Sequence, residues 1–122
     1  MSPERSRVLH ALAAGGCLDP AAEADALLDA SRAGGDPLEE LIARRLAGEP
    51  LGWITGWVRF CEARVGVDPG VFVPRPQTES LARRAAALLP EDGIAVDLCT
   101  GSGAVATVLG AARPRATVIA TD

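Results

Sequence analysis

Lysine and tyrosine are absent from this sequence of 122 residues, and its twelve basic side chains are all arginines. A bias of this kind indicates a GC-rich gene rather than a special function. The net charge of −4 excludes a general polyanion-binding surface, so we expect no direct nucleic-acid binding. Only 3% of the residues are aromatic, but 48% are hydrophobic, which is enough for the core of one ordinary domain.

Long hydrophobic runs are lacking as well. The apolar stretch within residues 1–16 is too short and too interrupted by charge for a signal peptide or a membrane span, so we expect a cytoplasmic protein without membrane contact. The three cysteines, Cys17, Cys61 and Cys99, are odd in number and far apart, which argues against a disulfide or a metal site. The single histidine, His10, has no second base beside it and enters no mechanism.

Residues 1–48 predict a small helical bundle. Ser2-Pro3, Asp19-Pro20 and Asp36-Pro37 each place a capping side chain before a proline that suits the first helical position. The third pair opens D-P-L-E, which is close to a capping box. Glycines at 15–16, 34–35 and 48 supply the stops, so we expect helices over residues 3–14, 20–33 and 37–47, each with one apolar stripe.

Residues 49–76 show no helical periodicity, and their pattern predicts a β-hairpin linker. Short β-type runs occupy residues 57–60, 63–67 and 71–73, and charged or Gly/Pro turns separate them. A helix is expected from about residue 78 to 89, with Leu81, Ala85, Leu88 and Leu89 on its apolar face.

Residues 77–122 predict the start of an α/β domain. The apolar run at 94–99 is typical of a parallel strand buried on both faces, a helix is expected at 104–112, and residues 116–122 read as a second buried strand. Strand, helix and strand in about thirty residues form a βαβ unit. The fold class is therefore α/β, with a helical bundle, a hairpin linker and a first βαβ unit.

The turn between the first strand and its helix is the candidate ligand site. Ligands of open α/β sheets bind at the carboxyl ends of strands, which are the ends that carry Asp97 and Asp122. Gly101 and Gly103 let a backbone approach a ligand closely, and the helix that follows offers free N–H groups to an anion. Asp122 holds the position of an acid that accepts hydrogen bonds from ribose hydroxyls.

Asp97 separates two candidate cofactors that the glycine pattern alone leaves open. A carboxylate before the first glycine adds negative charge next to the pyrophosphate of a dinucleotide such as NAD. S-adenosylmethionine carries an ammonium and a sulfonium, which favour nearby acids. The pattern D-x-x-x-G-x-G therefore favours S-adenosylmethionine over NAD.

Three separate segments resemble the PrmC/HemK family of protein-(glutamine-N5) methyltransferases. They are G-E-P-L-G-W-I-T-G at residues 48–56, P-R-P-Q-T-E at 74–79 and D-L-C-T-G-S-G at 97–103, and the resemblance covers roughly residues 44–122. It implies a Rossmann-like S-adenosylmethionine-dependent domain that methylates the side-chain amide of glutamine in peptide-chain release factors. It also implies that the helical domain helps to dock this protein partner.

The resemblance carries over residue by residue to the cofactor site. It implies that the site is formed by Asp97, Cys99, Thr100, Gly101, Ser102, Gly103 and Asp122. Three residues depart from the family pattern: Trp53 replaces a tyrosine, Gln77 a glutamate and Cys99 a glycine. For residues 74–79 two interpretations stay open, a rigid linker with Thr78 as helix cap, or a wall of the active site.

The family's N-P-P-Y segment, which the resemblance implies to hold the acceptor amide, is absent from these residues. We therefore expect a fragment of a two-domain protein that is inactive by itself, and no residue is assigned a catalytic role. Two alternatives stay open. One is a non-catalytic binding module, and the other is an amino-methyltransferase paralogue with another protein or a nucleic acid as substrate.

Overall fold

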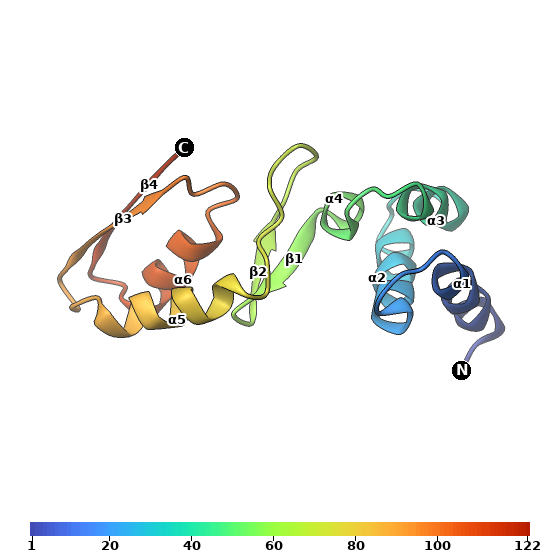
Figure 1. Ribbon diagram of the computed structural model, residues 1–122, viewed down its shortest axis with the longest axis horizontal. Coiled ribbons are helices and arrows are strands. Elements are labelled where there is room, and N and C mark those ends of the chain that lie inside the picture. The colour runs from blue at the N-terminus through green and yellow to red at the C-terminus, as the bar shows by residue number, and fades with distance from the viewer. The chain divides into compact units, whose positions relative to one another are not determined.

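The computed structural model describes residues 1–122 and is an α/β chain of six helices and two two-stranded sheets (Figure 1). The chain divides into two compact units, Met1–Thr55 and Gly56–Asp122. The longest helices have 12 and 13 residues, and none has both the length and the apolar character needed to cross a membrane.

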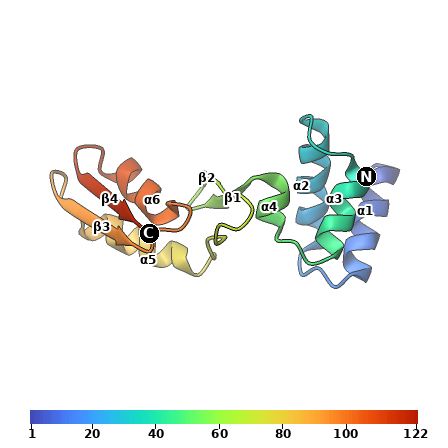
Figure 2. The same cartoon turned by 90° about the horizontal axis from the view of Figure 1, so that it is seen from above.

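The first unit is entirely helical. It consists of α1 (Pro3–Ala14), α2 (Pro20–Arg32), α3 (Leu38–Leu46) and the short α4 (Leu51–Thr55) (Figure 2). The three helices predicted from proline and glycine placement are confirmed to within one residue at each end. Helix α4 was not predicted, because five residues are too few to display a helical period.

Two of the three predicted N-caps are confirmed. Ser2 Oγ accepts a hydrogen bond from the Arg5 amide at 3.1 Å, and Asp19 Oδ1 accepts one from the Ala22 amide at 3.2 Å. The predicted cap at Asp36 is wrong, because Pro37 itself occupies the N-cap of α3 and no side chain caps this helix. The Asp36 carboxylate lies 3.3 Å from the Arg44 guanidinium instead.

The helix ends follow one repeated device. Gly16, Gly34 and Gly48 have φ angles of 82°, 92° and 98°, a left-handed conformation that glycine adopts without strain. In each case the next amide donates back to a carbonyl of the last helical turn, as the Cys17 amide does to the Leu12 carbonyl at 3.1 Å. Each of the three helices therefore ends two residues before its left-handed glycine.

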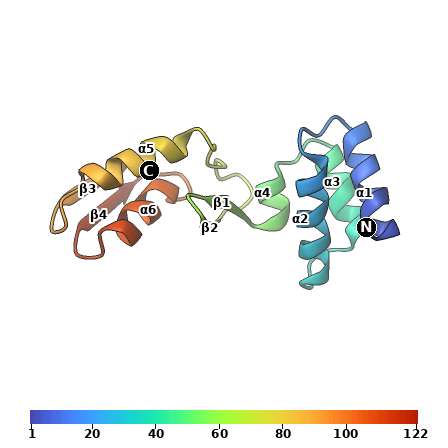
Figure 3. The ribbon, with the colours of Figure 1, turned by 90° about the horizontal axis from the view of Figure 1, so that it is seen from below.

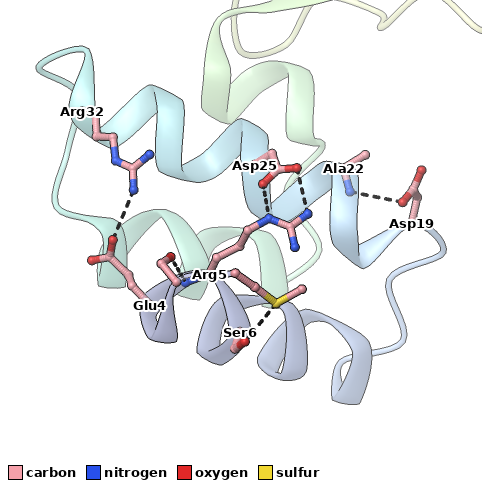
Figure 4. Close-up of polar contacts among 9 residues, drawn as sticks. Glu4, Arg5, Ser6, Asp19, Ala22, Asp25 and Arg32 are labelled. Carbon is pink, nitrogen blue, oxygen red and sulfur yellow. Dashed lines mark hydrogen bonds and ion pairs between the residues drawn. The ribbon is translucent and has the colours of Figure 1, made fainter.

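The core of the first unit lies where α1–α4 meet. It is formed by Val8, Leu12, Ala24, Leu27, Leu28, Leu41, Ile42 and Ile54. Ion pairs border it: Arg5 donates two hydrogen bonds to the Asp25 carboxylate at 2.6 and 2.9 Å and so connects α1 with α2 (Figure 4). The Arg5 guanidinium thereby holds the pKa of Asp25 below its usual value.

The second unit begins with a tight hairpin. Strands β1 (Trp57–Phe60) and β2 (Ala63–Gly66) pair antiparallel and so form the predicted hairpin, with Phe60 opposite Ala63. The two residues of the turn, Cys61 and Glu62, have φ angles of 48° and 62°. Two left-handed residues make a type I′ turn, which normally takes Asn-Gly. The third predicted β run, residues 71–73, forms no strand.

The remaining elements are α5 (Thr78–Leu88), β3 (Ile94–Leu98), α6 (Ala104–Ala112) and β4 (Thr117–Thr121) (Figure 3). Strands β3 and β4 pair in parallel, with Val96 opposite Ile119, and α6 connects them. The predicted βαβ unit is therefore confirmed.

One face of this small sheet is covered and the other is bare. Ala86 and Leu89, in and just after α5, and Leu109 of α6 pack with Ala95 and Val118 on the covered face. The prediction that both strands are buried on both faces is therefore wrong for these residues. The side chains on the opposite face are exposed, and they are Ile94, Val96, Leu98 and Ile119.

The buried face of α5 also differs from the prediction. Ala82 and Ala86 are buried, whereas Leu81 and Leu88 are 60% and 65% exposed. The small side chains face inward because α5 packs against α6. Leu89, directly after the helix, is buried as predicted, but apolar character alone could not identify the rest of this face, since Leu81 and Leu88 lie outside it.

Candidate functional site

The loop between β3 and α6 has a backbone that only a few residue types adopt without strain. Cys99, Gly101 and Gly103 have φ angles of 56°, 59° and 79°. A left-handed conformation costs a side-chain-bearing residue about 1–2 kcal/mol, which explains the preference for glycine at such positions. The departure at Cys99 therefore places a cysteine where the backbone favours glycine.

Asp97 organises this loop. Its Oδ2 atom accepts a hydrogen bond from Thr100 Oγ1 at 2.6 Å and another from the Ala106 amide at 3.1 Å. The carboxylate thus satisfies an amide in the first turn of α6 and compensates the positive end of that helix. Asp97 was predicted to bind the ligand, whereas in the structure its Oδ2 atom stabilises the loop through these two hydrogen bonds.

A backbone hydrogen bond joins the loop to the neighbouring strand. The Thr100 amide donates to the carbonyl of Thr121, the last residue of β4, at 2.9 Å. Asp122 follows Thr121 directly, so this bond brings Asp122 to the same edge of the sheet as the loop. The amides of Gly101 and Ser102 form no backbone hydrogen bond within the chain, and they are available to an acceptor on a ligand.

A hollow of about 700 Å³ lies against this loop. Its volume is within the usual range for small-molecule sites. Of the seven predicted site residues, six line it: Asp97, Cys99, Thr100, Gly101, Ser102 and Asp122. Gly103 does not line the hollow and serves as the N-cap of α6.

The other walls come from the hairpin and from the segment before α5. Phe60, at the end of β1, is 1% exposed and forms part of the wall. Phe72 and Arg75 line it as well, with the guanidinium carbon of Arg75 5.4 Å from the centre of the Phe72 ring. The sequence interpretation missed Phe60 and Phe72, because no local spacing connects residues so far from the glycine loop.

Residues 74–79 lie at the hollow only in part. Pro74, Arg75 and Thr78 line it, whereas Gln77 is exposed and does not. The proposed helix cap at Thr78 is wrong, because Gln77 is the N-cap of α5 and its side chain makes no capping bond. Glu79 accepts a hydrogen bond from the Cys61 amide at 3.0 Å and so connects α5 with the hairpin turn.

The three cysteines differ in their surroundings. Cys17 and Cys61 are half-buried, and burial raises the pKa of both thiols. Cys99 is exposed at the rim of the hollow. No group of three or more His, Cys, Asp or Glu side chains is arranged to hold a metal ion.

Comparison with curated proteins finds several relatives that carry the same name. The chain is 48% identical over 85 residues to a release factor glutamine methyltransferase from Mycolicibacterium smegmatis, which covers 69% of this chain and 30% of the relative. Over 84 residues it is 48% identical to the protein of the same name from Neisseria gonorrhoeae, covering 69% of this chain and 31% of the relative. Over 86 residues it is 42% identical to the protein of that name from Escherichia coli, covering 70% and 31%.

No protein-family model matches the chain. The chain spans about 30% of the length of the curated relatives it matches. Identity of 42% to 48% across more than eighty residues is nevertheless consistent among several bacteria. The resemblance drawn from the sequence is confirmed, and over the matched residues the chain belongs to the family of release factor glutamine methyltransferases.

Proposed function

We propose that this chain supplies the cofactor-binding part of an S-adenosylmethionine-dependent methyltransferase that acts on the side-chain amide of glutamine in peptide-chain release factors. The names of the curated relatives support the reaction. The single structural observation that carries the proposal is the hollow formed jointly by the loop at residues 97–102 and by Asp122. We further propose that β3, α6 and β4 begin a Rossmann-like domain.

The residues at the hollow fit the chemistry of this cofactor. We assign the Asp122 carboxylate, which lines the hollow, to the ribose hydroxyls, from which a carboxylate can accept hydrogen bonds. The unpaired amides of Gly101 and Ser102 can donate to the carboxylate of the amino-acid portion, as amides near a helix N-terminus commonly do. A Cβ added at Gly101 would meet no protein atom within 4 Å, so this position faces open space that a ligand can fill.

The chain's own contribution to the reaction is binding and orientation. S-adenosylmethionine supplies an electrophilic methyl group on a sulfonium. An amide nitrogen is a poor nucleophile because its lone pair is delocalised, so alignment and electrostatics must supply most of the acceleration. The described residues include no N-P-P-Y run, so we assign them cofactor binding and no catalytic step.

The helical unit has a proposed role in recognition. We propose that residues 1–48 help to dock the release factor, residues 49–76 form a linker, and residues 77–122 begin the methyltransferase domain. A competing function is a binding module without catalysis, which the lack of an acceptor segment in these residues favours for the isolated chain. Incubation of the chain with labelled S-adenosylmethionine and a release factor separates the two, and we expect no transfer of label by the isolated chain.

The cofactor assignment is tested by substituting Asp122. Loss of its charge-assisted hydrogen bonds in Asp122→Ala is expected to weaken S-adenosylmethionine binding about tenfold or more, measured by calorimetry. Asp92→Ala, which removes an exposed carboxylate that faces Arg115, is the matched control and should leave the affinity unchanged. Unchanged affinity in Asp122→Ala, or tighter binding of NAD than of S-adenosylmethionine, would contradict the assignment.

A further inference from the structure

The turn of the hairpin is in an unfavourable conformation for its residues. Cys61 and Glu62 are consecutive, both carry side chains, and both have left-handed φ angles of 48° and 62°. Type I′ turns are normally formed by Asn-Gly, because these residues adopt that conformation most readily. A Cys-Glu pair in this turn therefore needs stabilisation from outside the hairpin.

That stabilisation comes from Glu79 in the first turn of α5. Its Oε2 atom accepts a hydrogen bond from the Cys61 amide at 3.0 Å, and the Cys61 thiol donates to the Glu79 carbonyl at 3.6 Å. Arg83, one helical turn further along, lies 3.2 Å from the Glu79 carboxylate and 3.5 Å from that of Glu62. The turn and the start of α5 are thus joined by two hydrogen bonds and by the ion pair between Arg83 and Glu62, while the pair between Arg83 and Glu79 lies within α5.

Glu79 does not line the hollow, but the residues beside both ends of its hydrogen bond do. Phe60 precedes Cys61, and Thr78 precedes Glu79, and both are in the wall. The Phe60 side chain is buried in one cluster with Ala82 of α5 and Ala104 of α6. The hydrogen bond between the Cys61 amide and Glu79 therefore spans two segments of the wall that are far apart in sequence.

We propose that Glu79 is a positioning residue, which holds the hairpin turn on α5 and thereby sets the place of Phe60 and Thr78 in the wall of the hollow. It acts through these two residues and does not touch the ligand. The inference rests on the proposed function for the identity of the ligand, S-adenosylmethionine, and only for that. The arrangement itself depends on the hydrogen bond, the turn conformation and the burial of Phe60.

The first test compares three substitutions by calorimetry with S-adenosylmethionine. Glu79→Ala removes the acceptor and is expected to weaken binding about fivefold or more. Glu79→Gln keeps an oxygen that can accept from the Cys61 amide, so its affinity should lie within about twofold of the parent chain. Arg83→Met removes only the ion pairs and should also bind within about twofold.

A stability control excludes a general loss of folding. Ala86→Gly removes a buried methyl group from α5 at a position that does not line the hollow. Glycine inside a helix is destabilising, so this chain should unfold at lower urea concentration while it keeps its affinity for S-adenosylmethionine. Equal loss of affinity in Ala86→Gly and Glu79→Ala, or parental affinity in Glu79→Ala, would overturn the proposal.

Repairing the turn provides a rescue experiment. Cys61→Asn together with Glu62→Gly creates the residues that a type I′ turn prefers, so the turn no longer depends on the carboxylate. In this background Glu79→Ala should recover the part of the lost affinity that depends on the turn conformation, whereas the part that depends on attachment to α5 stays lost. A carboxylate that bound the ligand directly would not be replaceable in this way, so absence of rescue contradicts a role through the turn.

A measurement without ligand keeps the two proposals separate. Nuclear magnetic resonance of Glu79→Ala should show faster hydrogen exchange at the Cys61 amide and a weaker contact between the Phe60 ring and the Ala104 methyl group. If the parent chain does not bind S-adenosylmethionine but these changes occur, the cofactor assignment fails and the positioning role stands. If neither change occurs, the positioning role fails whatever the cofactor.

Discussion

At the scale of single residues, the site depends on backbone conformation as much as on side-chain chemistry. Cys99 occupies a left-handed position with a φ of 56°, and its side chain is exposed. The side chain therefore contributes little packing that could offset the unfavourable backbone. The family resemblance identified this residue as a departure, and the structure supplies its physical meaning.

Cys99→Gly is expected to stabilise the chain. Relief of a left-handed conformation gains about 1–2 kcal/mol, and the greater flexibility of glycine in the unfolded chain removes about 0.5–1 kcal/mol of this. The net gain in the free energy of unfolding should be about 0.5–1 kcal/mol by urea titration. Cys99→Ala keeps the β-carbon and should give no gain. Equal stabilisation by both substitutions would show that the left-handed conformation is not responsible.

The thiols should react in a fixed order. Cys99 is exposed, whereas Cys17 and Cys61 are half-buried and have pKa values raised by burial, which reduces the reactive thiolate. Brief treatment with iodoacetamide at neutral pH should therefore label Cys99 first, as followed by peptide mass spectrometry. Cys99→Ser should lose the early label. Early labelling of Cys61 would mean that its contact with Glu79 is not kept in solution.

From the sequence, the residues around the hollow could be predicted only where the pattern is local. The glycine loop was identified because it lies between a predicted strand and a predicted helix start, and Asp122 because it follows the next predicted strand. The structural role of Asp97 was not identified, because its partners Thr100 and the Ala106 amide come together only when the loop is folded. The same is true of Phe60, which reaches the hollow through tertiary packing.

At the scale of elements, α1 and α2 are joined by a surface ion pair whose effect depends on pH. The Arg5 guanidinium lowers the pKa of Asp25, so the folded chain binds this proton less readily than the unfolded chain. The stabilisation is present above the ordinary aspartate pKa of about 3.9 and is lost as the pH falls from there through the lowered value.

Asp25→Asn should therefore have a shallower decrease of unfolding free energy with falling pH, below about pH 4, than the parent chain. Urea titrations at a series of pH values measure this slope. Asp29→Asn on the same helix is the control, because no basic side chain lies within ion-pair distance of Asp29. A slope in Asp25→Asn that equals the parental slope would contradict the assignment. Salt should weaken the effect, since the pair is partly exposed.

The elements also show where sequence patterns carry enough information. Proline near the start of a helix and glycine after its end are local signals, and they located α1, α2 and α3. The face of α5 was predicted only in part, because close packing on α6 favours Ala82 and Ala86 over Leu81 and Leu88. The hairpin strands were predicted, but the hydrogen bond from the Cys61 amide to Glu79 has no sequence signature.

At the scale of the whole molecule, the parallel sheet of β3 and β4 has one exposed apolar face. Ile94, Val96, Leu98 and Ile119 are 71%, 54%, 73% and 46% exposed. Contiguous exposed apolar side chains in a folded protein are sites of association. The outer strands β3 and β4 also have unpaired edges, which adds to this tendency.

The chain should therefore bind a hydrophobic dye and self-associate as its concentration rises. Val96→Thr with Ile119→Thr, a cross-strand pair on the bare face, is expected to reduce both, as measured by dye fluorescence and sedimentation. Val118→Thr on the covered face is the control, because it should lower stability without reducing association. Dye binding that is unaffected by the paired substitution would place the apolar surface elsewhere.

The hydrogen bond from the Thr100 amide to the Thr121 carbonyl makes the loop a non-local structure. A chain still being synthesised has the glycines of the loop before it has β4, so it cannot yet present a formed site. Once both are in place, occupancy of the hollow and docking of β4 are reciprocally linked, and each raises the population of the other. A ligand bound at the loop should therefore slow amide hydrogen exchange along β4, including at residues that the ligand does not contact.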